Sequence, residues 1–482
     1  MLYDIIVVKD FFINCLLNFS TKQEFPEKRR NQNHDTGRKS ALLWAHGKNF
    51  PQFLKAMERL VAVPSYLKED DDYPHVPAIK KVLDETMALM KDLGYRTYAD
   101  PDGYYGWAEI GEGDTLIGIL GHLDVVPPGL IDDWKSDPFM VNYRDGKACG
   151  RGVQDDKGPT LTAVYAVKAL LDEGFTPNYR LRFIFGTDEE NLWRGIKVYM
   201  EKEEKPDFGF TPDSIFPLIH AEKGVLEYTL HAPNESGLTF KAGDAYNVVP
   251  SYVKAPKSKA LIEALKNLHY EYRDEGETVG ILGKGMHAQF AEKGVNAIHR
   301  YLLALEAMGY PTKAARFVKD NLEGHLFAEP IFGDVKDDAS GELKFNLGKI
   351  ELTEKEEILS IDMRLPVTYP KEKAVEAITQ KAAEYGFSYH EFDWLKPVYL
   401  PLDSPIIKKL MDSYVEATGD TEHKPLSSGG ATYARAMDNC VAYGIILPGV
   451  EKSEHMPNDN MVVDDYKTAM KIYIHTFVNF NR

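Results

Sequence analysis

Side chains that bind metals or transfer protons recur just after predicted strands along this chain. They are His122 and Asp124 after the apolar run 116–120, Glu189 and Glu190 after 179–185, Asp213 after 208–211, and His455 after 441–447. A further carboxylate, Asp155, lies in a glycine-bracketed loop, 150–158, that leads into a predicted helix. In α/β sheets, ligands bind beyond the carboxyl ends of the strands. We therefore expect these side chains to meet at one edge of a sheet.

Imidazole and carboxylate groups in such positions indicate a site for divalent cations. Zn²⁺ is commonly bound by histidine and carboxylate ligands, and two ions about 3.5–4 Å apart need a shared bridging ligand. Three carboxylates and a bound hydroxide offset almost all the charge of two divalent ions, so burial is tolerable. Taken singly, Asp155 could belong to a solvated turn, Glu189 and Glu190 could begin a helix, and His455 could be any loop histidine. Their joint occurrence after strands favours the metal site.

The elements that would position these residues alternate between strands and helices. The sequence predicts helices over 77–93, from its apolar spacing, and over 159–171 and 196–202, and these alternate with the strands named above. This order predicts an α/β fold with a mostly parallel, helix-covered sheet. Near Val225 the pattern becomes mixed, and the first pattern resumes after Val398. We therefore predict a flexible tail over 1–40, a catalytic domain over 41–224 plus 399–482, and an inserted α+β lid domain over 225–398.

Composition narrows the possible partners and the compartment. The chain has 482 residues, and its 74 acidic against 57 basic residues give a net charge of −17. This charge argues against a nucleic-acid or anionic-membrane partner, and no apolar run approaches the roughly 20 residues of a membrane span. The three cysteines are far apart, which fits a reducing compartment and excludes a disulfide scaffold. Because residues 1–19 also lack the features of a signal peptide, we expect a cytoplasmic protein.

Five motifs carry a resemblance to a known family. They are Gly121–Pro127, Gly150–Pro159, Gly186–Gly195, Thr211–Pro217 and Glu454–Pro457. Together they resemble the di-zinc metallopeptidase superfamily that includes aminoacylase, succinyl-diaminopimelate desuccinylase, peptidase T and bacterial glutamate carboxypeptidase. Within that superfamily the sequence is most similar to the dipeptidase PepV branch. The resemblance runs from about Asn49 to the C-terminus and leaves out the N-terminal forty residues.

The resemblance implies a role for each of these residues. His122, Asp155 and Asp213 would hold one divalent ion, and Asp155, Glu190 and His455 would hold the other, with Asp155 bridging. The ions would be Zn²⁺, although His and carboxylate sites also accept Mn²⁺ or Co²⁺. Asp124 would accept the other ring N–H of His122, and Glu189 would be the general base. A cis peptide bond is expected at Asp155–Asp156.

The resemblance also assigns residues of the predicted lid and of a glycine turn. His287 would stabilise the oxyanion, and Asn247 would help to polarise the scissile carbonyl. Arg364 and the turn containing Gly430 would bind the free carboxylate of the substrate. A pocket that holds both ends of a ligand predicts hydrolysis of short unblocked peptides, chiefly dipeptides. Because the large insert could replace the histidine that dimeric relatives take from a partner subunit, we expect a monomer.

Specific residues exclude some other functions and leave one of them open. A deacylase acting on N-acyl amino acids would use the same metal ligands and stays an alternative. A metal-free binding protein is disfavoured because every predicted ligand, Asp124 and Glu189 are present. Thermolysin-like chemistry is excluded because His390-Glu391 lacks the second histidine of that motif, and there is no phosphate-binding P-loop or dinucleotide glycine motif. No histidine adjoins Cys149 or Cys440, so a cysteine nucleophile is unsupported.

Overall fold

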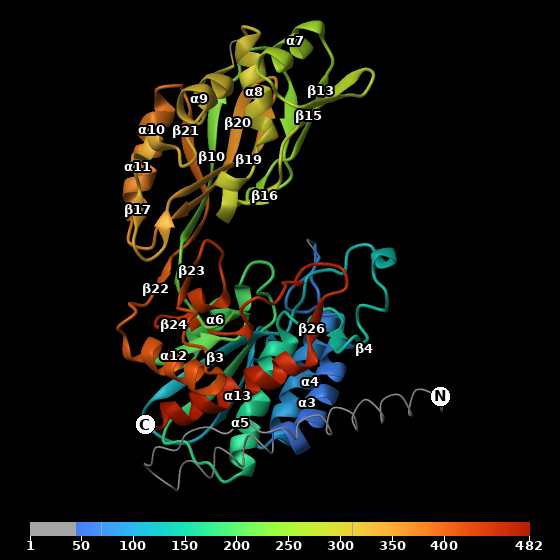
Figure 1. The fold of residues 1–482 in the computed structure, drawn as a ribbon, viewed down its shortest axis with the longest axis vertical. Coiled ribbons are helices and arrows are strands. Elements are labelled where there is room, and N and C mark those ends of the chain that lie inside the picture. Colours follow the sequence, from blue (N-terminus) through green and yellow to red (C-terminus); the bar gives the residue numbers. More distant parts are fainter. Residues whose placement is uncertain (1–44, 69, 311) are drawn as a thin grey trace.

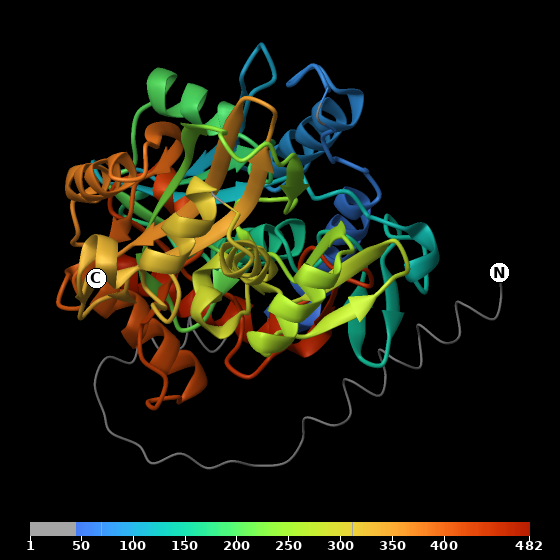
Figure 2. The same cartoon turned by 90° about the horizontal axis from the view of Figure 1, so that it is seen from above.

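The computed structural model describes residues 45–482 except Glu69 and Pro311, and the predicted tail over 1–40 lies outside the described residues. Two lobes stand one above the other along the longest axis (Figure 1). Each lobe has its own apolar core: the lower core takes its residues from 50–218 and 398–480, and the upper core from 226–387. Seen from above, the upper lobe lies over the lower one (Figure 2).

The lower lobe is built on a nine-stranded sheet with the order β1-β2-β6-β3-β7-β24-β9-β22, in which β23 also pairs with β9. Its centre is parallel, from β6 through β3 and β7 to β24. The flanking strands β1, β2, β9 and β22 are antiparallel to their neighbours in this order, and β23 pairs parallel with β9. The strands are β1 (Arg96–Ala99), β2 (Gly106–Ile110), β3 (Leu116–His122), β6 (Arg180–Gly186), β7 (Phe208–Thr211), β9 (Ile219–Glu222), β22 (Val398–Tyr399), β23 (Leu426–Ser428) and β24 (Cys440–Ala442).

Alternation of side chains along the central strands gives this sheet two apolar faces. Ile117 and Ile119 of β3 enter the main lower core, whereas Leu120 enters a smaller cluster on the opposite face. The main core is formed with α3 (Phe50–Val61), α4 (Pro77–Asp92), α5 (Lys157–Asp172), α12 (Pro405–Thr418) and α13 (Val463–Phe480), and the smaller cluster with α6 (Arg194–Lys202) and η4 (Tyr433–Ala436). Helices thus cover both faces, as the sequence predicts.

The upper lobe has a five-stranded antiparallel sheet with the order β11-β19-β20-β10-β21. Its strands are β10 (Gly224–Pro233), β11 (Phe240–Ala242), β19 (Lys344–Leu352), β20 (Glu356–Leu365) and β21 (Ser388–Leu395), and its helices are α7 (Lys259–Asn267), α8 (Ala297–Ala307), α9 (Lys313–Asn321), α10 (Glu329–Phe332) and α11 (Lys371–Ala383). The chain enters this lobe through β10 and leaves it through β21, so the two connections between the lobes lie on adjacent strands (Figure 1).

Short ribbons complete both lobes. In the lower lobe they are β4 (Asn142–Arg144), β5 (Lys147–Cys149) and β26 (Asn460–Val462), which form one sheet, and β8 (Ser214–Ile215) with β25 (Ile445–Ile446). In the upper lobe they are β12 (Val248–Val249) with β16 (Met286–His287), β13 (Tyr252–Pro256), β14 (Tyr272–Asp274) and β15 (Thr278–Leu282) in one sheet, and β17 (Lys336–Asp337) with β18 (Gly341–Glu342).

One predicted strand is divided in the structure. The run 441–447 forms β24 and β25, which pair with β7 and β8 respectively. Gly444 lies between them with φ +96°, and a Cβ there would come 2.4 Å from the Tyr473 hydroxyl. A close approach and a left-handed conformation break the strand at this glycine. Across the described part of the chain, we find no helix with the length and apolar character required to cross a bilayer.

Candidate metal centre

His122 ends β3, whose seven residues are all buried. Its ring Nδ1 lies 3.0 Å from the main-chain oxygen of Asp124 and 3.6 Å from the carboxylate Oδ1 of the same residue. The resemblance predicted Asp124 as the acceptor of this ring N–H, and its carbonyl oxygen is the nearer of the two groups and can accept an Nδ1 proton. That tautomer leaves Nε2 as a ligand atom. Although burial opposes protonation, Asp124, Asp155 and Asp213 raise the pKa of His122 well above its ordinary value.

Asp155 lies at the centre of the arrangement. One carboxylate oxygen is 2.9 Å from Nε2 of His122, and the other is 3.0 Å from Nε2 of His455. The peptide bond to Asp156 is cis, as the resemblance predicted. The Asp156 carboxylate accepts hydrogen bonds from the His122 amide at 3.0 Å and from the Thr160 hydroxyl at 2.6 Å. Asp156 thereby fixes the loop against β3, while Asp155 reaches both imidazoles.

Glu189 and Glu190 lie in the turn between β6 and α6 and do not begin a helix. Glu190 Oε2 is 3.0 Å from Nε2 of His455, and the Glu190 amide donates to the Asp124 carboxylate at 3.0 Å. Burial and Asp155 raise the pKa of Glu190 to about 7. Burial also raises the pKa of Glu189 well above its ordinary value, with Asp213 and Glu190 adding to the shift. Both carboxylates therefore lie where a nearby positive charge would stabilise their ionised forms.

Asp213 follows β7, with Oδ2 at 3.6 Å from Nε2 of His122. Two groups of possible metal ligands contain His122. The first group is His122, Asp155 and Glu190, and the second is His122, Glu189 and Asp213. Within each group the ligand atoms lie within 4.8 Å of one another. Nε2 of His122 and Oδ1 of Asp155 are buried and face each other at 2.9 Å, and neither atom has any other hydrogen-bond partner among the described residues. Buried imidazole and carboxylate ligand atoms that converge in this way fit a divalent cation.

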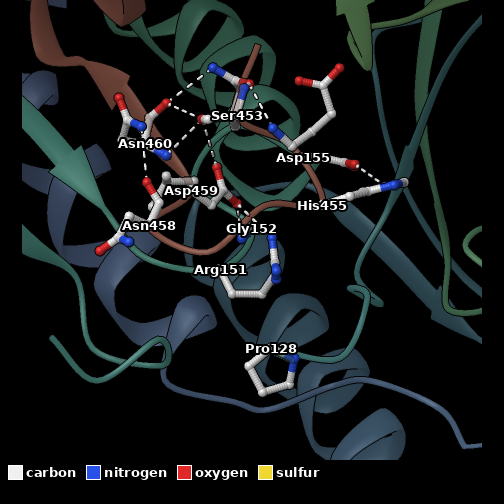
Figure 3. A network of polar contacts seen from close by, with 12 residues as sticks. Pro128, Arg151, Gly152, Asp155, Ser453, His455, Asn458, Asp459 and Asn460 are labelled. Atoms are coloured by element: carbon white, nitrogen blue, oxygen red, sulfur yellow. Dashed lines mark hydrogen bonds and ion pairs between the residues drawn. The ribbon is translucent and has the colours of Figure 1, made fainter. Parts of the chain in front are cut away.

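His455 reaches the centre on a loop from the C-terminal part of the chain. The loop follows β25 and ends at β26, whose Asn460 pairs with Cys149 of β5. This pairing sets the loop beside the 150–158 loop that carries Asp155 (Figure 3). His455 has φ +64° and a side chain that is 54 % exposed, so packing alone holds it weakly. The structure thus brings together all five side chains predicted as metal ligands, together with Asp124 and Glu189.

Asn247 and His287 lie together on the upper lobe, at the β12–β16 ribbon. Val248 pairs with His287, and the Ala288 amide donates to the Asn247 carbonyl at 2.8 Å. This ribbon is at the end of the upper lobe that faces the lower one (Figure 1). Nδ1 of His287 accepts from the Gln289 amide at 3.2 Å. Desolvation, with repulsion from Arg364, lowers the pKa of His287 to about 4, so the ring is neutral near pH 7.

Arg364 is buried at the join of the two lobes. Its Nε and Nη2 donate to both oxygens of the Asp362 carboxylate, and its Nη1 donates to Gly429 O at 3.1 Å. The next residue, Gly430, donates its amide to the Ser428 hydroxyl at 2.9 Å. The structure therefore brings Arg364 to the predicted glycine turn. Sequence reasoning missed Asp362, although its i, i+2 spacing from Arg364 on one strand signals a shared face.

Sequence reasoning also missed Arg435 and Glu222, which form a buried ion pair with 3.1 Å between Nε and Oε2. Arg435 also donates to Gly430 O and Lys223 O, each at 2.7 Å, and to Lys396 O at 2.7 Å. Lys223 immediately precedes β10, and Lys396 immediately follows β21. One guanidinium thus holds both connections between the lobes and the glycine turn, and no local motif signals a pair so distant in sequence.

Comparison with known proteins supports the same family. A family model described as "Peptidase family M20/M25/M40" matches residues 118–479. A protein of Bacillus subtilis named "Putative dipeptidase YtjP" is 32 % identical over 447 residues, covering 87 % of this chain and 95 % of that protein. A "Putative dipeptidase" of Staphylococcus epidermidis is 33 % identical over 449 residues, which cover 87 % of this chain and 94 % of that protein.

Solved structures support the fold. Human carnosine dipeptidase 1 superposes with a TM-score of 0.59 at 17 % identity, covering 92 % of this chain and 98 % of that one. The di-peptidase Dug1p of Saccharomyces cerevisiae superposes with a TM-score of 0.57 at 12 % identity, and the match covers 92 % of this chain and 98 % of that one. Residues 118–479, which the family model matches, include every side chain of the candidate centre described above. The chain therefore belongs to the M20/M25/M40 family of peptidases.

Proposed function

We propose that this protein is a metal-dependent dipeptidase that hydrolyses the amide bond of short, unblocked peptides. The observation that carries the proposal is the position of Asp155, whose two carboxylate oxygens lie 2.9 and 3.0 Å from the imidazoles of His122 and His455. A carboxylate between two imidazoles is placed to bridge a pair of divalent cations. The relatives named as dipeptidases support the same reaction.

His122, Asp155 and Asp213 would hold one ion, and Asp155, Glu190 and His455 would hold the other. The donor set of nitrogen and oxygen atoms suits Zn²⁺ and also accepts Mn²⁺ or Co²⁺. When bound, such ions activate water at neutral pH and polarise the carbonyl oxygen of an amide. Three carboxylates among the ligands would offset most of their charge.

Glu189 is the proposed general base. Its carboxylate accepts the proton of the attacking water and passes it to the nitrogen of the leaving amine. Burial raises the pKa of Glu189, which favours holding a proton between these two transfers. Glu189 lies with Asp213 and His122 in one of the two groups of ligand atoms, so it faces the reacting centre.

His287 is the proposed donor to the oxyanion. Because its Nδ1 accepts from the Gln289 amide, the neutral ring carries its proton on Nε2. That N–H is free to donate to the oxygen that becomes negative in the transition state. Asn247, on the same ribbon, would support the scissile carbonyl, and the Arg364–Gly430 region would receive the free carboxylate of the substrate.

The same proposal includes the organisation of the chain. We divide it into a catalytic domain over 41–224 plus 399–482 and a lid domain over 225–398, a division that the two separate apolar cores support. The lid would supply His287 within one chain, so we propose a monomer. Analytical ultracentrifugation tests this, since an obligate dimer whose activity falls on dilution would contradict it. We also propose a cytoplasmic location.

The test of the function combines metal content with substrate hydrolysis. Purified protein should contain two divalent ions per chain, and it should cleave unblocked dipeptides faster than the matching N-acetylated amino acids. Glu189→Ala should keep both ions and lose nearly all turnover. Faster cleavage of N-acyl amino acids would favour the deacylase alternative, and a metal-free native protein would contradict the proposal.

A further inference from the structure

We infer that Gln154 is a positioning residue that fastens the His455 loop to the Asp155 loop and so assembles the second cation position. The inference rests on the proposed metal assignment above. Gln154 immediately precedes Asp155, and its side chain is buried at 3 % exposure. The resemblance assigned it no role, and neither Gln154 nor its partners bind the ions in the proposed set.

The carboxamide of Gln154 makes four hydrogen bonds, all to the main chain of the neighbouring loop. Oε1 accepts from the amides of Ser453 at 2.6 Å and Glu454 at 3.0 Å. Nε2 donates to the carbonyl oxygens of Asn460 at 3.0 Å and Glu451 at 3.4 Å. The two amides directly precede His455, so the anchor lies one peptide bond from the proposed ligand.

The His455 loop needs such an anchor because its backbone is strained. His455 and Asn458 both have φ +64°, a left-handed conformation that residues other than glycine adopt less readily. The 54 % exposed side chain of His455 adds little packing. Strained conformations persist where surrounding contacts over-determine them, and the Gln154 hydrogen bonds supply those contacts.

Asp459 fastens the same two loops at their other end. Its carbonyl oxygen accepts from the Gly150 amide and its carboxylate from the Gly152 amide, both at 2.9 Å. Arg151 is buried beside it, with 3.7 Å between Nη1 and Oδ2 (Figure 3). Asp459 thus holds the end of the loop at β26, whereas Gln154 holds the segment that aims His455.

This arrangement makes the two cation positions unequal in their dependence on Gln154. His122 is the last residue of β3, and Asp213 lies two residues after the end of β7, so neither belongs to the His455 loop. Loosening that loop removes His455 from its place beside Glu190, where the present separation is 3.0 Å. We therefore expect loss of Gln154 to weaken one ion and spare the other.

The experiment measures metal binding by apo protein rather than turnover. Zn²⁺ or Co²⁺ is titrated against a competing chelator into wild type, Gln154→Ala, Gln154→Met and His455→Ala. Removing partners that orient metal ligands commonly costs 10–100-fold in metal affinity. We expect both Gln154 variants to lose at least tenfold in the second binding step, to approach His455→Ala, and to keep the first step within threefold.

Two further measurements separate positioning from a general loss of structure. Gln154→Met keeps the buried volume without the hydrogen bonds, and the exposed Gln380→Ala on α11 is the matched control. Hydrogen–deuterium exchange should rise in 451–460 and stay unchanged in β3. If wild type binds two ions and both Gln154 variants bind them with wild-type affinity, the inference is overturned while the proposed function stands. If wild type binds none, the proposed function fails first.

Discussion

Nη1 of Arg364, on the upper-lobe strand β20, donates a hydrogen bond over 3.1 Å to the carbonyl oxygen of Gly429 in the lower lobe. The next carbonyl, Gly430 O, accepts from Arg435 at 2.7 Å. Two buried arginines thus hold successive carbonyl groups of one glycine turn. A Cβ at Gly429 would come 2.7 Å from Cβ of Gln289 in the upper lobe, so only glycine permits this approach.

Arg435 should be a major source of stability at the join of the lobes. Arg435→Met leaves Glu222 buried and unpaired, and breaking such a pair costs about 3–5 kcal/mol. Urea unfolding should show this loss, and the double variant Glu222→Met with Arg435→Met should recover part of it. The matched control is Arg180→Met, which breaks the more exposed Arg180–Glu204 pair and should cost about 1 kcal/mol or less. Equal costs at the two sites would contradict the role given to Arg435.

Glu189→Gln tests proton transfer without removing volume. The amide cannot accept the proton of the attacking water, so kcat should fall by about 10²–10⁴-fold. Metal content should equal that of wild type, because Glu189 is outside the proposed ligand set. A variant that loses its ions would make Glu189 a ligand, and retained activity would remove it from its role. Glu201→Gln, on α6, provides the control substitution.

His287→Ala removes the proposed donor to the oxyanion. Loss of a single donor of this kind costs about 10²–10³-fold in kcat. Metal binding should be unchanged, because His287 belongs to the upper lobe. Steady-state kinetics with one dipeptide would measure the effect beside His390→Ala, which alters an exposed histidine of the same lobe. A pure rise in KM with unchanged kcat would show that His287 binds substrate without stabilising the transition state.

His299 on α8 should make the upper lobe sensitive to acid. Burial lowers its pKa from 6.5 to about 4, and its Nε2 has no hydrogen-bond partner among the described residues. The unfolded chain therefore binds more protons than the folded one between these values, so stability is full above about pH 6.5 and falls as the pH drops. We expect a loss of roughly 2 kcal/mol between about pH 7.5 and about pH 5.

Hydrogen–deuterium exchange of the α8 backbone amides, followed against pH in metal-free protein, would measure this loss of stability. His299→Leu should flatten the pH dependence, and His325→Leu, which alters a more exposed histidine, should leave it unchanged. If the stability of His299→Leu and of wild type falls equally steeply with pH, the acid sensitivity comes from other groups.

Much of this architecture follows from local sequence. The strands that lead to His122, Glu190 and Asp213 are apolar runs followed by polar residues, and the structure gives them at nearly the predicted bounds. Their convergence follows from the rule that parallel strands deliver their carboxyl ends to one edge. The family resemblance supplied the lid residues and the cis bond, which no periodicity indicates.

Other features depend on contacts that a single sequence hides. The break at Gly444 depends on Tyr473 and Phe216, which approach it from other elements. The antiparallel flanks of the lower sheet come from short strands such as β9 and β22, whose bounds carry weak patterns. Gln154 reads as an ordinary loop residue until its partners, about 300 residues away, lie beside it.

The discontinuous lower core has a consequence for synthesis on the ribosome. β24, the His455 loop and the core helix α13 all follow the whole upper lobe in the sequence. The nascent chain can therefore present His122, Asp155 and Glu190 long before His455 emerges to join them. Hydrolytic capacity would therefore arise only after the His455 loop has been synthesised, which keeps an unfinished enzyme from acting on peptides around it.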